Sequence, residues 1–141
     1  MRRRDIEMLQ RVAGQALDRA RQAAQEQAQA VSALEAAVAR VDAACAEERG
    51  RAEQDAAGFL MLAAYLDEQR SRRDRLASDL AAAQAELDRR LRATHEAWLE
   101  ARRYEEMLAR IDAAERIAQA RREAAFLDWV AERQHARAER G

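Results

Sequence analysis

Apolar and small side chains recur along this chain at alternating steps of three and four residues. In the first third, the repeat occupies Leu17, Ala20, Ala24, Gln27, Val31, Leu34, Val38, Val41 and Cys45. This spacing places its members on one face of an α-helix, and a sustained seven-residue repeat of this kind is typical of a coiled coil. The pattern predicts a first long helix over residues 4–48, approximately.

A second repeat predicts another long helix in the remainder of the chain. It occupies Leu76, Leu80, Ala83, Leu87, Leu91, Thr94 and Trp98, and continues through Tyr104, Leu108, Ile111, Ala118, Ala125 and Trp129. The two four-residue steps between 83 and 91 indicate a local stutter in the repeat. We therefore expect a second helix over residues 59–139, approximately.

The repeat weakens between the two helices, which predicts a turn. Extended past residue 45, it falls on Glu48, Ala52 and Asp55 before it returns at Phe59, Leu62 and Leu66. Gly50 and Gly58 flank this stretch, and glycine often ends helices. An Ala-rich helix is marginal alone in water, so the chain is expected to fold back on itself there. The expected fold is all-α, a single domain over 1–141 in which two long helices form an antiparallel coiled-coil hairpin with its turn at 49–58.

A second position for the turn, at 67–74, is also compatible with the repeat. Ser71 and Asp74 could form a capping box in this segment. A turn near residue 54 leaves the residues after about 105 without an internal partner, whereas a turn near 71 would pair Trp129 with Ala13. The two glycines favour the first position.

Charged side chains outside the repeats suggest solvated helix faces. An acidic residue precedes Arg by four positions, the favourable order for a helical ion pair. The pairs are Glu7/Arg11, Glu47/Arg51, Glu68/Arg72, Glu86/Arg90, Asp88/Arg92, Glu106/Arg110 and Asp112/Arg116.

The composition favours helix and a thin core. The 141 residues include no Pro and four Gly, and 37 of the apolar residues are Ala, while aromatic residues make up 4%. Helix propensity is therefore high, whereas a layered sheet would have little to fill its interior. All 25 basic residues are Arg, interspersed with 26 acidic residues, so the net charge is −1. This balance excludes a basic footprint for nucleic acid, and the lack of a long apolar run argues against insertion into a membrane.

The residue types needed for catalysis or metal binding do not cluster in the sequence. His95, His135 and Cys45 are far apart, and the four glycines are isolated, so no phosphate-binding loop is expected. We expect no enzyme activity, no catalytic residue, no cofactor and no metal site, and we infer that function depends on surfaces that bind other proteins.

Two clusters of large side chains are the candidates for such surfaces. One cluster, at 59–66, comes directly after the predicted turn, and its side chains could bind a partner or pack over the loop. The other lies at 126–130, where a turn near 54 would leave it uncovered. With the flanking arginines, the candidate partner-binding residues are Arg2, Arg3, Arg4, Phe59, Leu62, Tyr65, Leu66, Phe126, Trp129, Val130 and Arg133.

The chain resembles the FliJ family of flagellar export proteins and the YscO class of injectisome proteins. The spacing of Ile6, Leu9, Val12-Ala13, Leu17-Asp18 and Ala20 is similar to that family's first helix, and Trp98-Leu99-Glu100 with Arg102-Arg103 is similar to its Trp-x-Glu-basic segment. The resemblance extends over nearly the whole chain. Departures are the absence of Lys and a more apolar run after Gly58.

The resemblance implies a non-enzymatic, cytoplasmic stalk protein of a type III export apparatus, peripheral to the inner membrane. Such a protein inserts into the hexameric export ATPase and promotes its assembly, contacts the export gate, and binds export chaperones. It also implies that the N-terminal arginines and residues 126–140 face the ATPase, while 59–66 face the gate. The alternative interpretation is a structural coiled-coil scaffold that self-associates.

Overall fold

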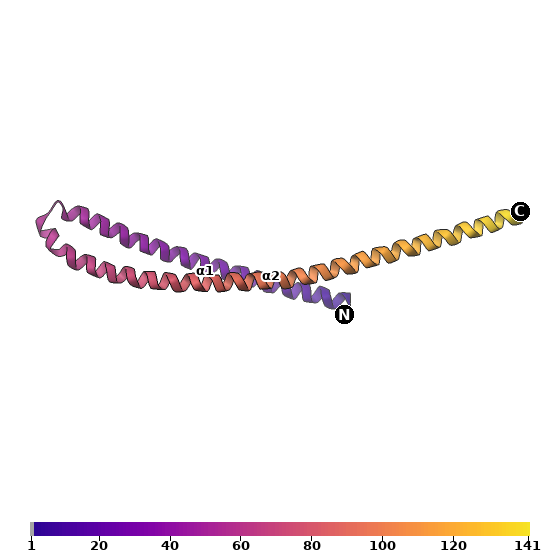
Figure 1. Ribbon diagram of the computed structural model, residues 1–141, viewed down its shortest axis with the longest axis horizontal. Helices are drawn as coiled ribbons and strands as arrows, with labels where there is room; N and C mark the ends of the chain where they lie inside the picture. The colour runs from indigo at the N-terminus through magenta and orange to yellow at the C-terminus, as the bar shows by residue number, and fades with distance from the viewer. Residues whose placement is uncertain (1) are drawn as a thin grey trace. The chain divides into compact units, whose positions relative to one another are not determined.

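The computed structural model describes residues 2–141, apart from the side chain of Ala56. The described chain folds as two helices, α1 (Arg3–Ala52) and α2 (Ala56–Arg140), which run antiparallel to each other (Figure 1). The predicted fold class, an all-α hairpin of two long helices, is confirmed.

The connection between the helices is shorter than predicted and is not made by glycine. It comprises residues 53–55, inside the predicted window, but Gly50 and Gly58 both lie within helices and neither has a positive φ. Asp55 instead caps α2, because its side-chain Oδ1 accepts a hydrogen bond from the backbone N–H of Ala57 at 3.0 Å. The predicted ends at 48 and 59 are therefore wrong, and each helix extends into the supposed turn.

The alternative turn at 67–74 is wrong. Helix α2 passes through this segment without interruption, and Ser71 and Asp74 are exposed helical residues. The pairing of Trp129 with Ala13 that this turn required is also wrong, because half of the Trp129 surface is exposed.

The chain divides into two compact units. The hairpin unit is Ala16–Ala97, which contains the connection between the helices. The terminal unit combines the residues up to Gln15 with Trp98–Gly141. Each unit contains a part of α1 and a part of α2.

The core of the hairpin unit follows the repeat predicted for the first helix. All nine predicted positions from 17 to 45 are buried or half-buried. The repeat does not lapse afterwards as predicted, because Glu48 is half-buried and Ala52 is buried. The small side chain of Ala52 keeps the helices in contact up to the connection.

The repeat in α2 continues without the predicted stutter. After Leu87, the half-buried positions are Arg90, Thr94 and Ala97, whereas Leu91 and Trp98, which were expected in the core, are exposed. Arg90 can occupy a core position because its guanidinium reaches polar partners: it donates to the backbone carbonyl of Ala23 at 2.9 Å and to Glu86 at 3.1 Å. The pKa of Glu86 is lowered chiefly by its hydrogen bond from Arg89, and the hydrogen bond from Arg90 lowers it further.

Two further polar contacts join α1 to α2 in the hairpin unit. Gln27 Nε2 donates to the carbonyl of Ala83 at 2.9 Å, and Arg73 Nε donates to Asp42 at 2.7 Å. The hydrogen bond from Arg73 holds the pKa of Asp42 below its usual value. Since each contact joins one position of α1 to one of α2, together they fix the register of the helices.

In the terminal unit, the start of α1 packs against the middle of α2. Ile6 is the most buried apolar residue, and Ala13 and Ala101 are also buried. Arg3 forms ion pairs with Asp112 and, at 2.8 Å, with Glu115. Beyond Ala118, every described residue of α2 is exposed except the half-buried Val130, and this stretch extends past the N-terminus of α1 (Figure 1).

Most of the ion pairs predicted four residues apart are not formed. Among the described residues, Glu47–Arg51 and Glu86–Arg90 are present and the other five predicted pairs are not. Several arginines pair in the reverse order or at three residues, as in Arg3–Glu7, Arg102–Glu106 and Arg89–Glu86. Exposed pairs of this kind contribute little, so alternatives compete easily.

Candidate functional site: two exposed apolar surfaces

An aromatic pair forms the centre of one exposed surface near the end of α2. The rings of Phe126 and Trp129 stack with their centroids 6.1 Å apart, and the Arg133 guanidinium carbon lies 4.8 Å from the centroid of Trp129. We call Phe126, Leu127, Trp129, Val130 and Arg133 the C-terminal surface. Its three large apolar side chains, Phe126, Leu127 and Trp129, are 51–64% exposed.

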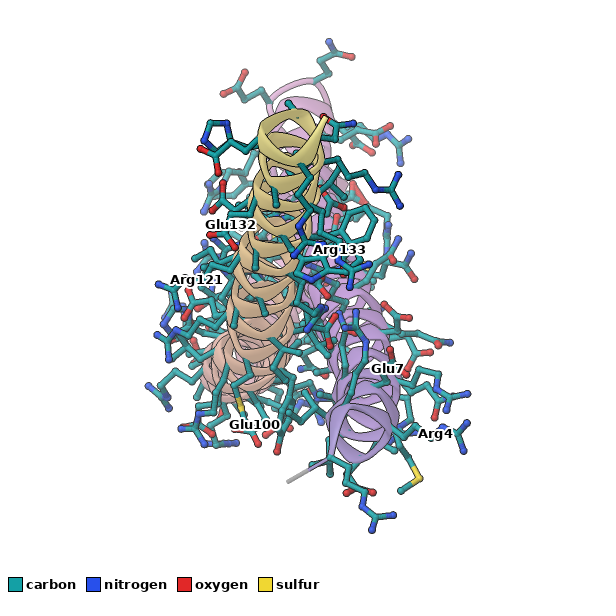
Figure 2. The ribbon with its side chains drawn as sticks, turned by 90° about the vertical axis from the view of Figure 1, so that its right-hand side faces the viewer. Arg4, Glu7, Glu100, Arg121, Glu132 and Arg133 are labelled. Carbon is teal, nitrogen blue, oxygen red and sulfur yellow. The ribbon has the colours of Figure 1, made fainter. Side chains whose placement is uncertain are left out.

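The spacing of these residues explains their grouping. Phe126, Trp129, Val130 and Arg133 fall three, four and seven positions apart, which places them on one face of the helix. Figure 2 shows Arg121, Glu132 and Arg133 extending outward from this part of α2. Stacking and the cation–π contact order the aromatic side chains before any partner binds, which suits them as anchors in an interface.

The three N-terminal arginines have different environments. Arg3 is engaged by Asp112, Glu7 and Glu115, and its hydrogen bond to Asp112 is the main cause of a raised pKa. Arg4 is exposed, forms no ion pair within residues 2–141, and extends away from α2 (Figure 2). Arg2 is exposed and its backbone N–H donates to Asp5 at 3.2 Å. Of these three predicted residues, Arg2 and Arg4 are therefore the two whose guanidinium groups form no ion pair with any described residue.

The second surface lies beside the connection in the hairpin unit. Phe59, Leu60 and Met61 are 65–84% exposed, although the repeat predicted that Phe59 rejoins the core. Leu62, Tyr65 and Leu66 are half-buried, so they belong to the contact between the helices as well as to its edge. The sequence cluster thus divides between packing and an exposed apolar surface. We call Phe59, Leu60 and Met61 the hairpin-end surface.

The cluster predicted at 59–66 included Leu60 and Met61, its two most exposed members, but neither was singled out as a partner-binding candidate. The signal was available, because both are large apolar residues that lie off the repeat. A large side chain off the repeat has no place in a two-helix core, so it must face solvent or a partner.

An open groove of about 750 Å³ adjoins this surface. Both helices contribute to it: Glu48, Arg51 and Ala52 come from the end of α1, and the apolar side chains come from the first turns of α2. The groove is lined by Glu48, Arg51, Ala52, Asp55, Gly58, Leu60, Met61, Leu62, Ala64, Tyr65 and Glu68. It therefore combines an apolar surface with acidic side chains.

The described part of the chain presents no arrangement suited to metal binding. No three of its His, Cys, Asp and Glu side chains are grouped to hold a metal ion. Cys45 is half-buried, and His135 Nε2 lies 3.0 Å from Glu139, its neighbour one turn away. Neither helix, over the residues described, has an apolar stretch long enough to cross a membrane.

No protein-family model, no curated protein and no solved structure matches this chain.

Proposed function

We propose that this protein is a non-enzymatic stalk of a bacterial type III export apparatus, flagellar or injectisome. In this proposal it inserts into the hexameric export ATPase, promotes assembly of the hexamer, and contacts the export gate and export chaperones. It acts in the cytoplasm, at the inner-membrane export apparatus. The resemblance of its helices to the FliJ and YscO proteins suggests this role.

The observation that supports the proposal most is the exposed stretch of α2 after Ala118. More than twenty consecutive helical residues there have no helical partner among the described residues, yet they carry Phe126, Leu127 and Trp129. A helix of this length is marginal in water without packing, and exposed aromatic residues are typical of binding anchors. The stretch is therefore suited to entering another protein.

The surfaces suggest how the proposed roles are divided. A single helix inside a ring presents different side chains to six equivalent subunits, so its contacts can favour one arrangement of the ring over others. We assign this role to the C-terminal surface, together with Arg2 and Arg4. We assign the hairpin-end surface to contact with the gate or a chaperone.

The test is hydrolysis and assembly of the export ATPase encoded in the same genome, measured with and without this protein. The proposal predicts faster hydrolysis and a shift from small species to the hexamer. The double variant Phe126→Ala/Trp129→Ala should lose both effects, whereas the matched double Leu60→Ala/Met61→Ala should retain them. No effect of the wild-type protein on either property would contradict the proposal.

A self-associating scaffold is the second candidate, and one observation favours it. The exposed stretch of α2, together with the exposed Ile117 just before it, has its own three-four repeat at Ile117, Ala120, Ala124, Leu127, Ala131, Gln134 and Ala138. Such a repeat could pair with a second copy. Sedimentation velocity separates the candidates, because a stalk should remain monomeric at micromolar concentration, whereas a scaffold should form dimers or larger species that Leu127→Gln disrupts.

A further inference from the structure

The end of the hairpin carries an excess of acidic residues. Between residues 47 and 68 there are six acidic and two basic side chains, so the segment has a net charge of −4 (6 acidic minus 2 basic), whereas the whole chain has −1. The acidic residues are Glu47, Glu48, Glu53, Asp55, Asp67 and Glu68, and the basic residues are Arg49 and Arg51.

The acidic excess is available to a partner. Arg51 is held by Glu47 at 2.7 Å and lies 3.9 Å from Glu48, so the cation at the groove is already neutralised. Glu53, Asp67 and Glu68 are exposed and form no ion pair with any described residue. Their carboxylates are therefore open to a cation that a partner supplies.

Apolar side chains line the groove together with one of these three carboxylates, that of Glu68. Leu60 and Met61 line the groove and are 84% and 75% exposed, and Glu68 and Asp55 line it with them. Leucine and methionine provide apolar area for an incoming side chain, and methionine adapts its flexible thioether to different shapes. Apolar surface beside unpaired carboxylates is complementary to a helix with one apolar face and basic flanks.

The acidic region has a sharp boundary that limits the size of the ligand. Immediately after it, α2 carries four exposed arginines, Arg70, Arg72, Arg73 and Arg75, of which only Arg73 pairs with a described acidic residue, Asp42. A basic ligand that extended over them would be repelled. The residues of α2 from Gly58 to Glu68 span about 15 Å at 1.5 Å per residue, which corresponds to about three helical turns of a partner.

We propose that the hairpin-end groove binds a short, basic amphipathic helix of another protein. Leu60 and Met61 contact its apolar face, while Glu53, Asp67 and Glu68 pair with Lys or Arg on its flanks. An anionic membrane would be repelled by the same carboxylates, so a lipid surface fits less well.

This inference rests on the proposed function only in that the gate or chaperone would supply the helix. The two fail separately. If the protein stimulates the export ATPase but binds no basic helix, the inference alone is wrong; if it binds the helix but leaves the ATPase unchanged, the proposed function alone is wrong.

The test is fluorescence anisotropy of a labelled model peptide with the full-length protein. The peptide is an amphipathic helix of about 11 residues with Leu on one face and Lys on the flanks, and its analogue has Glu in place of every Lys. We expect saturable binding of the Lys peptide that weakens as salt rises from about 50 to 300 mM, and no binding of the Glu peptide.

Variants of the hairpin end identify the site. The double variant Leu60→Gln/Met61→Gln should weaken binding about tenfold. The triple variant Glu53→Gln/Asp67→Asn/Glu68→Gln should weaken it several-fold and flatten its dependence on salt. The matched control Asp18→Asn/Asp79→Asn/Asp88→Asn removes three exposed carboxylates elsewhere in the hairpin unit and should bind like the wild type. Circular dichroism checks that each variant remains helical.

Several results would overturn the inference. One is that the Lys peptide shows no saturable binding, and another is that the Glu peptide binds as tightly as the Lys peptide. A third is that the control triple variant weakens binding as much as the triple variant of the hairpin end. Co-sedimentation with anionic phospholipid vesicles that is lost in Leu60→Gln/Met61→Gln would assign the surface to a membrane. A dimer of the wild type that the same double variant dissociates would assign it to a second copy of this chain.

Discussion

At the residue scale, position in the repeat decides what a side chain does, and residue type is secondary. Val31 and Val12 both belong to α1, but Val31 is 8% exposed and Val12 is 54% exposed. Conversely, Arg90 and Gln27 are half-buried because each finds a backbone carbonyl on the other helix. Leu91 was wrongly predicted in the core because the prediction considered only which side chains are apolar. It did not consider that a long polar side chain such as that of Arg90 can take the core position and still reach a polar partner.

The two valines provide a matched test of the repeat. Val31→Asp places a charge between the helices and should lower the free energy of unfolding by about 3 kcal/mol, whereas Val12→Asp should change it by less than about 0.5 kcal/mol. Urea unfolding followed by circular dichroism measures both. Similar losses in the two variants would refute the assignment of the core face.

At the scale of elements, the sequence predicted two helices and the approximate place of their connection, but for the wrong reason. Glycine was taken as the signal, while Asp55 is the residue that caps α2. The repeat allowed either turn, because a seven-residue period is preserved when one helix slides by whole heptads. Polar contacts such as Arg73–Asp42 distinguish the two registers, and such contacts cannot be predicted from the periodicity of apolar residues.

Because Gly50 and Gly58 lie within helices, we predict that alanine at either position makes the fold more stable. A Cβ at Gly50 meets no atom within 4 Å, and at Gly58 its nearest contacts are 3.8–3.9 Å, an ordinary packing distance. Gly50→Ala and Gly58→Ala should each raise the free energy of unfolding, by up to about 1 kcal/mol, because alanine favours helix. Thermal unfolding checks this. Destabilisation by either substitution would show that the glycines serve the turn after all.

The Asp42–Arg73 pair predicts a pH-dependent contribution to the contact between the helices. The pKa of Asp42 is lowered in the folded chain, so its stabilisation is present above the unfolded value, about 4, and is lost as pH falls through the folded pKa. Asp42→Asn should therefore lower Tm at about pH 7 and have no effect at about pH 2.5. Asp18→Asn, at an exposed residue without an ion pair, serves as the control. A Tm difference for Asp42→Asn that persists in acid would contradict this assignment.

At the scale of the whole molecule, the sequence predicted the fold class but could not determine which surfaces remain exposed. That outcome depends on the register, and in the terminal unit the contacts of α1 end where Arg3 meets Asp112 and Glu115. The C-terminal surface is exposed because it lies beyond this point. The candidate residues Phe126, Trp129 and Arg133 could be selected from their types alone, but their stacking could not.

Exposure of the C-terminal surface predicts a separation of stability from binding. Phe126→Ala and Trp129→Ala should leave Tm and helicity nearly unchanged, because these side chains have little internal packing to lose. Ile6→Ala, at the most buried apolar residue of the same unit, should cost about 2–4 kcal/mol. Calorimetry measures the three variants. A large loss of stability on removing Phe126 or Trp129 would show that a second copy or another part of the chain covers them.

The most direct test of the stalk proposal is site-specific photo-crosslinking in a strain that expresses the cognate export apparatus. A photoreactive amino acid is placed at Phe126 in one variant and at Leu60 in another, and the cross-linked partners are identified by mass spectrometry. The account predicts that position 126 cross-links to the export ATPase and that position 60 does not. Cross-links from position 126 to a second copy of this chain, or to no subunit of the apparatus, would contradict it.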